Sequence, residues 1–393
     1  MSYEIGTTAL PDFGIRFLSD FWEDKYLKKY IPNGGSKVKF VTGQGGSGKT
    51  HFLKLMSASA REMNYQVVQF SARSVWLHDF KSIYMEILKQ CDLMECLRGC
   101  SQKIIGEMGY RVEEIPEGMT FLDYLASEGM ADALTRRELR EQLKKMFLDN
   151  PLLDNNFAIA CSRLTGSLLG HPVLEESNKA LLLSWLSCEP SVKLTQLRPL
   201  GLSPSKITKY NARHMLRSLA EVVRLGGFSG LFVTIDELEI LISGSSLEEL
   251  HYTKVKREDT YESIRQLIDD IDSMHNIMFV FAFHRDLMDN KNAGIKSYQA
   301  LWMRIQNEVS GEHFNRFADI VDLDRLAVQE YTPQVLVEIS ESLAQSMQSF
   351  SVVPITKQQA EEILKQVKIG VGSVPKLIYN TMTEGETYVT EKS

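Results

Sequence analysis

Residues 43–50 read Gly-Gln-Gly-Gly-Ser-Gly-Lys-Thr, and this stretch decides the fold. It fits the pattern G-x-x-x-x-G-K-[ST] at every position, between a predicted strand, Lys37–Thr42, and a predicted helix, Lys49–Asn64. Glycines let backbone N–H groups approach phosphate oxygens without a Cβ clash, and a helix N-terminus adds partial positive charge. The sequence therefore predicts a phosphate-binding loop made of Gly43, Gln44, Gly45, Gly46, Ser47, Gly48, Lys49 and Thr50.

Two side chains of this loop are expected to contact a bound nucleotide and its metal ion. Lys49 should reach the β- and γ-phosphates of a nucleotide, and the hydroxyl of Thr50 should ligate Mg²⁺. The alternative is a chance glycine turn between a strand and a helix, without a ligand.

The chain on either side of the loop predicts an α/β fold. Strands and helices alternate around the loop, which is typical of a parallel sheet with crossover helices. The apolar runs later in the chain suit buried parallel strands. The expected helices are Pro11–Ile31, Val75–Leu93 and Tyr261–Met274, and the further strands are Gln66–Phe70, Gly230–Ile235, Ile277–Phe283 and Ile320–Leu323.

The strand pattern disappears in the middle of the chain and again near its end. Amphipathic helices are expected at Thr135–Leu148, Asn155–Leu168, Glu175–Ser187 and Asn211–Leu225. We therefore divide the chain into a first half of the nucleotide-binding core at 1–93, a helical insertion at 94–225, a second half of the core at 226–330, and a C-terminal helical lid at 331–393.

The second chemical motif is a carboxylate pair after a buried strand. Asp236 and Glu237 follow the apolar run Gly230–Ile235. Burying two carboxylates is unfavourable unless a cation binds them. We therefore expect Asp236 to hold Mg²⁺ and Glu237 to orient and deprotonate the attacking water. An acidic N-cap for the next helix is the alternative. Asn290-Lys291-Asn292-Ala293 lacks the aspartate of the guanine-reading N-K-x-D motif, which favours ATP.

This order of motifs resembles the AAA+ ATPases, nearest their origin-recognition-like branch. A closer resemblance is to the bacterial P-loop family that includes the BrxD-type ATP-binding proteins of BREX phage defence. It spans roughly Phe13 to Met382. The segments that carry it are Ala180–Leu186, Leu197–Gly201, Asn211–Leu216, Gly227–Leu231 and Ile235–Glu239.

The resemblance implies further site residues. His284, at the end of the strand before Arg285, is the positional candidate for sensing the γ-phosphate, although it could equally cap the next turn. Arg304 is the candidate arginine finger, with Arg316 as the runner-up and a solvated helix-face arginine as the alternative. Lys376 occupies the lid position where AAA+ proteins usually have a sensor arginine, and lysine lacks the bidentate geometry of arginine.

Composition limits the function classes. The chain has 393 residues, of which 44% are hydrophobic and 24% charged, so it is not disordered as a whole. Its formal net charge is −7, so the protein as a whole is not a cationic protein that coats DNA or membranes. Five cysteines argue against a disulfide framework, and the N-terminus has no signal-peptide pattern, so we expect a cytoplasmic protein without a membrane anchor. Cys91, Cys96 and Cys100 match no zinc spacing and indicate helix packing instead.

One segment is locally basic. Residues 191–227 contain seven basic side chains against the single acidic Glu221, namely Lys193, Arg198, Lys206, Lys209, Arg213, Arg217 and Arg224. This Lys193–Arg224 segment could contact the phosphates of double-stranded DNA, be solvated, or dock an acidic protein partner.

The sequence therefore predicts an ATP-binding, Mg²⁺-dependent AAA+-like ATPase. We expect it to form a homo-oligomer and to work with other defence-system proteins as a DNA-associated motor or loader. The alternative is a slow nucleotide-dependent switch that assembles a protein complex without acting on DNA. A nucleotide kinase, with the insertion as its substrate domain, fits the carboxylate pair less well.

Overall fold

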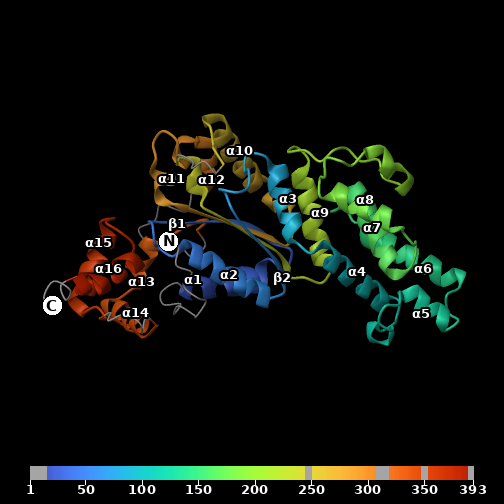
Figure 1. The fold of residues 1–393 in the computed structure, drawn as a ribbon, viewed down its shortest axis with the longest axis horizontal. Coiled ribbons are helices and arrows are strands. Elements are labelled where there is room, and N and C mark those ends of the chain that lie inside the picture. Colours follow the sequence, from blue (N-terminus) through green and yellow to red (C-terminus); the bar gives the residue numbers. More distant parts are fainter. Residues whose placement is uncertain (1–15, 244–249, 307–317, 347–352, 388–393) are drawn as a thin grey trace.

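The centre of the protein is a five-stranded parallel sheet with the order β2-β3-β4-β1-β5 (Figure 1). A computed structural model describes residues 16–243, 250–306, 318–346 and 353–387 of the chain. The five predicted strands are confirmed to within one residue at each end. They are β1 (Ser36–Gly43), β2 (Tyr65–Ser71), β3 (Gly230–Asp236), β4 (Ile277–His284) and β5 (Ile320–Asp322).

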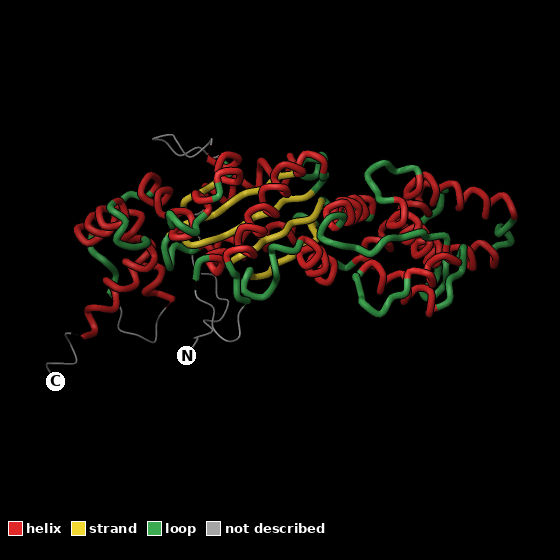
Figure 2. The backbone as a smooth tube through the Cα atoms, turned by 90° about the horizontal axis from the view of Figure 1, so that it is seen from above, coloured by secondary structure: helices red, strands yellow, loops and turns green. Residues whose placement is uncertain are grey.

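Helices cover both faces of the sheet, which is why its strands are apolar on both sides (Figure 2). One face packs against α1 (Arg16–Trp22) and α2 (Lys49–Glu62), where Trp22 and Phe52 belong to the same apolar cluster as Phe232 and Met278 of the sheet. The other face packs against α3 (Phe80–Gln90), α9 (Ala212–Leu225), α10 (Lys254–Asp270) and α12 (Gln299–Ile305).

Helix boundaries differ from the sequence prediction where capping residues set them. The helix expected at Val75–Leu93 begins at Phe80, because the side chain of Asp79 caps it through the N–H of Lys81. The helix expected at Tyr261–Met274 begins at Lys254, after the cap Thr253, and ends at Asp270, with a 3₁₀ turn beyond it. The N-terminal helix continues past Trp22 as a π-helix, Glu23–Tyr30, and its predicted start at Pro11 lies outside the described residues.

The insertion extends from one end of the sheet as a helical bundle (Figure 1). The sequence prediction did not delimit its first two helices. The bundle shares one continuous apolar core with the adjacent sheet face rather than having a core of its own. Its helices are α4 (Leu93–Glu107), α5 (Phe121–Ser127), α6 (Ala133–Leu143, with a π-helical end to Leu148), α7 (Asn155–Leu169) and α8 (Glu176–Leu186).

The C-terminal helices lie at the opposite end of the sheet from the insertion (Figure 1). They are α13 (Leu323–Glu330), α14 (Pro333–Ser346), α15 (Lys357–Lys368) and α16 (Val374–Thr387). A separate apolar cluster holds them together. Helix α13 joins the two parts, because Leu323 and Leu326 pack on the sheet while Ala327 packs on the lid. Among the described residues, none of the helices is long and apolar enough to cross a bilayer.

A glycine contact fixes how the insertion meets the core. A Cβ added to Gly99 of α4 would lie 2.0 Å from the carbonyl oxygen of Gly226, just after α9. The two backbones therefore touch at a point where no larger residue fits. Gly106, on the same helix, would meet nothing within 4 Å.

We expect Gly99→Ala to lower the free energy of unfolding by about 1–3 kcal/mol, as overpacking does. Gly106→Ala is the matched control and should be neutral or stabilising by up to about 1 kcal/mol, because alanine favours helix. Thermal unfolding of both variants checks this. If Gly99→Ala had the same melting temperature as the parent protein, α4 and α9 would be able to move apart without loss of stability.

Candidate functional site

The phosphate-binding loop connects β1 to α2 at the carboxyl edge of the sheet. Gly46 and Gly48 have φ of +80° and +89°, a conformation that glycine adopts without strain. A Cβ on Gly43 would lie 2.5 Å from Oγ of Ser47. The glycines at these positions therefore allow the tight loop that the sequence predicted.

Lys49 lies folded over this loop. Its Nζ donates hydrogen bonds to the carbonyl oxygens of Gly43 at 3.1 Å and Gln44 at 2.9 Å. Burial lowers the pKa of Lys49, while surrounding carboxylates, first Glu239 and then Asp324, oppose that effect. A phosphate group entering the loop would offer this ammonium stronger, charged acceptors than the two carbonyls.

Thr50 and Asp236, the two residues assigned to Mg²⁺, are in direct contact. The Thr50 hydroxyl donates to Oδ2 of Asp236 at 2.6 Å, bringing the first turn of α2 to the end of β3. A hydroxyl and a carboxylate side by side at the phosphate loop form an oxygen donor set that suits Mg²⁺. The residues therefore fit a magnesium ion held by Thr50, Asp236 and the phosphates of a nucleotide.

Glu237 is held by two residues that the sequence prediction missed. Its carboxylate accepts hydrogen bonds from Oγ of Ser71 at 2.6 Å and from Nε of Arg73 at 2.9 Å. Its own φ of +60° turns the chain sharply after β3. Ser71 pairs with Asp236 in the parallel register, so the ends of two adjacent strands could have indicated this contact.

His284 contacts both the following turn and the phosphate loop. Its Nδ1 accepts the N–H of Asp286 at 3.3 Å, which is the capping alternative, and lies 3.1 Å from the Asp286 carboxylate. Its Nε2 lies 3.7 Å from where a Cβ of Gly45 would be. The backbone N–H of His284 donates to Glu239, another residue that the sequence prediction left unassigned. Sensing by His284 stays a prediction, with the ring in reach of the loop.

A buried ion-pair cluster supports the loop from behind. The N–H of Gln44 donates to Oδ2 of Asp324 at 2.6 Å, and Arg285 bridges Asp322 at 2.6 Å and Asp324 at 3.2 Å. Burial raises the pKa of Asp324, while the Gln44 N–H and the Arg285 guanidinium oppose the shift. The cluster ties the phosphate loop to the residue after His284 and to the first turn of α13. The sequence analysis gave Asp324 no role.

The lid touches the phosphate loop directly. The Ser373 hydroxyl, buried at the start of α16, donates to the carbonyl oxygen of Gly45 at 3.1 Å. A Cβ on Gly46 would lie 3.3 Å from the Cβ of Lys376. Lys376 therefore lies close to the loop, and its role as a sensor stays a prediction.

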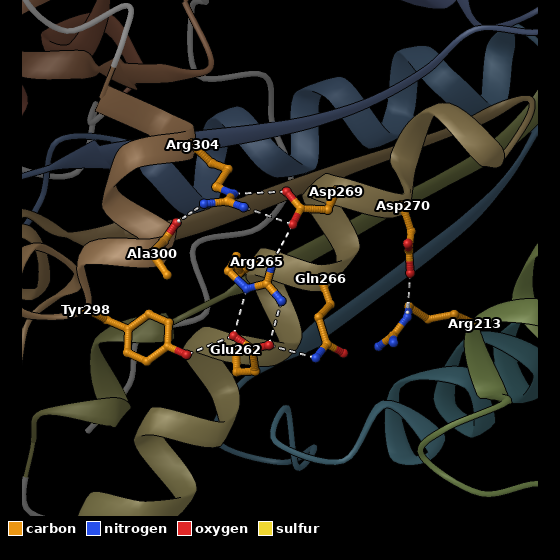
Figure 3. A network of polar contacts seen from close by, with 9 residues as sticks. All are labelled: Arg213, Glu262, Arg265, Gln266, Asp269, Asp270, Tyr298, Ala300 and Arg304. Carbon is orange, nitrogen blue, oxygen red and sulfur yellow. Dashed lines mark hydrogen bonds and ion pairs between the residues drawn. The ribbon is translucent and has the colours of Figure 1, made fainter.

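Arg304 lies in an ion-pair network on α10 and α12 (Figure 3). It donates from Nε and Nη2 to the two oxygens of Asp269, at 3.0 and 3.2 Å, and from Nη1 to the carbonyl of Ala300. Asp269 also pairs with Arg265, which donates to Glu262. A finger role would require the Arg304–Asp269 pair to open, and it stays a prediction. Arg316 lies outside the described residues.

The basic segment is partly neutralised. Arg213 pairs with Asp270 at 2.8 Å, and Arg224 forms a bidentate pair with the buried Glu221. Four other basic side chains of the segment are exposed, namely Lys193, Arg198, Lys206 and Lys209. The three clustered cysteines are buried in the apolar core: Cys91 at the end of α3, and Cys96 and Cys100 on α4.

Comparison with known proteins gives one family match. A family model described as BREX system ATP-binding protein BrxC/D matches residues 25–382. This range includes the phosphate loop, the Asp236–Glu237 pair, His284, Arg304 and Lys376. No curated protein and no solved structure matches the chain.

We expect Lys49→Ala to abolish ATP binding or to weaken it severely, because the cation aimed at the β- and γ-phosphates is lost. The fold should survive, since the hydrogen bonds that Lys49 makes within the described part of the chain are all to the loop itself. Lys54→Ala, which removes an exposed lysine one turn further along α2, is the matched control and should bind ATP like the parent. Titration with a fluorescent ATP analogue measures the affinity of both variants. If Lys49→Ala bound the analogue as tightly as the parent does, the assignment of Lys49 to the phosphates would be wrong.

Proposed function

This chain belongs to the BrxC/D family of BREX system ATP-binding proteins, and we propose that it is a Mg²⁺-dependent, AAA+-like ATPase that drives a step of phage defence. The observation that carries the proposal is the meeting of four groups at one sheet edge. Lys49 would bind the phosphates, Thr50 and Asp236 would hold the metal ion, and Glu237 would position the attacking water.

Each group has a separate part in in-line attack of water on the γ-phosphate. Lys49 stabilises the charge that develops on the transferred group. We propose that His284 hydrogen-bonds to the same group, because its Nε2 lies 3.7 Å from where a Cβ of Gly45 would be. Glu237 orients the water and takes its proton. A bound Mg²⁺ would supply additional positive charge at the phosphates.

The strand order supports the AAA+-like assignment. Strand β4 lies between β1, which ends in the phosphate loop, and β3, which ends in Asp236. A strand between those two motifs is what an AAA+-like core would have, and the end of β4 carries His284. Ser373 and Lys376 place the lid against the same loop, so nucleotide bound there would touch core and lid together.

A slow switch is the second candidate, favoured by the way two catalytic groups are held. Glu237 is bonded to Ser71 and Arg73, and Arg304 is bonded to Asp269. Both groups must leave strong partners before they can act on ATP. A partner that opens these contacts would raise the turnover, and without one the protein would bind ATP and hydrolyse it slowly.

The motor or loader hypothesis adds a contact with double-stranded DNA through the exposed lysines and arginine of the Lys193–Arg224 segment. Phosphate contacts release counterions, so binding should weaken steeply with salt. We also propose that the protein acts as a homo-oligomer together with other proteins of its defence system.

We expect Glu237→Gln to bind ATP like the parent but to hydrolyse it at least roughly 10²-fold more slowly, because the general base is lost while shape is kept. Single-turnover hydrolysis of labelled ATP measures this. Glu113→Gln, an exposed glutamate on the insertion, is the control and should leave the rate unchanged. Undiminished hydrolysis by Glu237→Gln would assign the water to another residue.

We expect Arg304→Ala to bind ATP nearly normally and to hydrolyse it roughly 10³-fold more slowly, the lower end of the range for a finger arginine. Mixing Arg304→Ala with Glu237→Gln should restore part of the activity, since a mixed interface can pair an intact Glu237 with an intact Arg304. Asp269→Asn, made alone, should hydrolyse ATP faster than the parent, because Arg304 loses its ion-pair partner. Activity that never exceeds the sum of the two variants would leave Arg304 as a surface arginine.

The rate of ATP hydrolysis with and without double-stranded DNA separates the two functional hypotheses. A motor or loader should be stimulated by DNA, and the stimulation should fade as salt rises. A switch should assemble on ATP without such stimulation. Size-exclusion chromatography of Glu237→Gln with and without ATP follows the assembly directly.

A further inference from the structure

Two adjacent residues of the phosphate loop are held from outside the loop. The backbone N–H of Gln44 donates to Oδ2 of Asp324, and the carbonyl oxygen of Gly45 accepts a hydrogen bond from Oγ of Ser373. These partners lie 280 and 328 positions away in sequence, in the first turn of α13 and directly before α16. The assignments of phosphate, metal and water made above use neither of them.

Asp324 is a fixed acceptor on the sheet side of the loop. It is 3% exposed, and its Oδ2 also accepts a hydrogen bond from Arg285 at 3.2 Å. Its backbone N–H donates to Oδ1 of Asp322 at 3.0 Å. Leu323 and Leu326, in the same turn of α13, belong to the apolar cluster of the sheet. Asp324 is therefore anchored to the sheet and cannot turn away from the loop.

Ser373 belongs to the lid. It is fully buried, and the next residue, Val374, is part of the apolar cluster of the lid, which is separate from the cluster of the sheet. A displacement of the lid relative to the sheet would therefore change the distance between Ser373 and Gly45. The loop is thus held by one contact that is fixed to the sheet and by one that follows the lid.

Gln44 in turn orders the rest of the loop. Its carbonyl oxygen accepts hydrogen bonds from Nζ of Lys49 at 2.9 Å and from the N–H of Ser47 at 3.2 Å. A phosphate loop binds through backbone N–H groups that converge on the anion. When the loop is already ordered, phosphate binding does not lose the conformational entropy of ordering it. Contacts that fix Gln44 and Gly45 therefore favour binding.

The charge of Asp324 acts in the opposite direction. Its carboxylate is among those whose charge influences Lys49, so it is close enough to repel a phosphate bound at the loop. If charge alone mattered, removing the carboxylate would tighten nucleotide binding. If the hydrogen bond to Gln44 matters more, removing it weakens binding. The sign of the change in affinity therefore separates the two effects.

We infer that Asp324 and Ser373 are positioning residues for phosphate binding, which act through the backbone of Gln44 and Gly45 and not by contact with the nucleotide. Asp324 holds the loop in its binding conformation, and Ser373 makes that conformation depend on the position of the lid. This inference rests on the proposed function, because it takes the loop to bind the phosphates of ATP.

The first test is titration of the full-length protein with a fluorescent ATP analogue. Asp324→Ala should bind it roughly 10- to 100-fold more weakly, as the loss of a hydrogen bond to a charged group does. Asp324→Asn is the conservative variant. Its single carbonyl oxygen can accept from both Gln44 and Arg285, as Oδ2 does in the parent, so it should recover most of the lost affinity.

The second test uses two fully buried serines of the lid. Ser373→Ala should weaken binding roughly 2- to 10-fold, because it removes one neutral hydrogen bond to the loop. Ser340→Ala is the matched control. The Ser340 hydroxyl bonds to Val337 and Ile355 within the lid, so this variant should bind like the parent. If Asp324→Ala does not fold, this pair of variants decides.

Three outcomes would overturn the inference. One is binding by Asp324→Ala that is unchanged or tighter. Another is binding by Asp324→Asn that is as weak as that of Asp324→Ala, since the charge and not the hydrogen bond would then be responsible. The third is equal weakening by Ser340→Ala and Ser373→Ala, which would reflect the stability of the lid. Lys49→Ala, measured alongside, separates these failures from failure of the proposed function, because only the latter leaves its affinity equal to that of the parent.

Discussion

The parallel register of β1, β3 and β4 is the constraint on which the rest of the structure depends. Gly43 pairs with His284, and Ser71 on β2 pairs with Asp236. Because all strands run in the same direction, each one delivers its last polar residue to the same edge. The apolar strands exclude water up to that edge, so charges placed there act on one another and on a bound phosphate rather than on solvent.

The edge is rich in carboxylates and has few cations to balance them. Asp236, Glu239, Asp322 and Asp324 all act on Lys49, whose pKa burial lowers against their influence. Arg285 neutralises part of this charge behind the loop. This excess of negative charge is consistent with our proposal that the nucleotide binds there together with a Mg²⁺ ion. The same buried contacts connect that ligand to β4 and to α13, the helix from which the lid extends.

Helix α10 packs against α12 of the core and forms an ion pair with α9, at the end of the insertion. Its acidic C-terminal turn holds Arg304 on one side and Arg213 of the insertion on the other (Figure 3). Asp269 and Asp270 are adjacent in sequence. Loss of one of the two ion pairs therefore changes the electrostatic environment of the other.

The sequence by itself determined the chemistry that is local in the chain. The glycine loop, Thr50 and the Asp236–Glu237 pair follow from spacing and from the strands that precede them, and their strand ends were predicted within one residue. Only the tertiary structure decided which residues distant in sequence complete the site. Ser71 and Arg73 on Glu237, Asp324 on Gln44 and Asp269 on Arg304 depend on strand order and helix packing. Those contacts arise from long-range packing, and no local pattern encodes it.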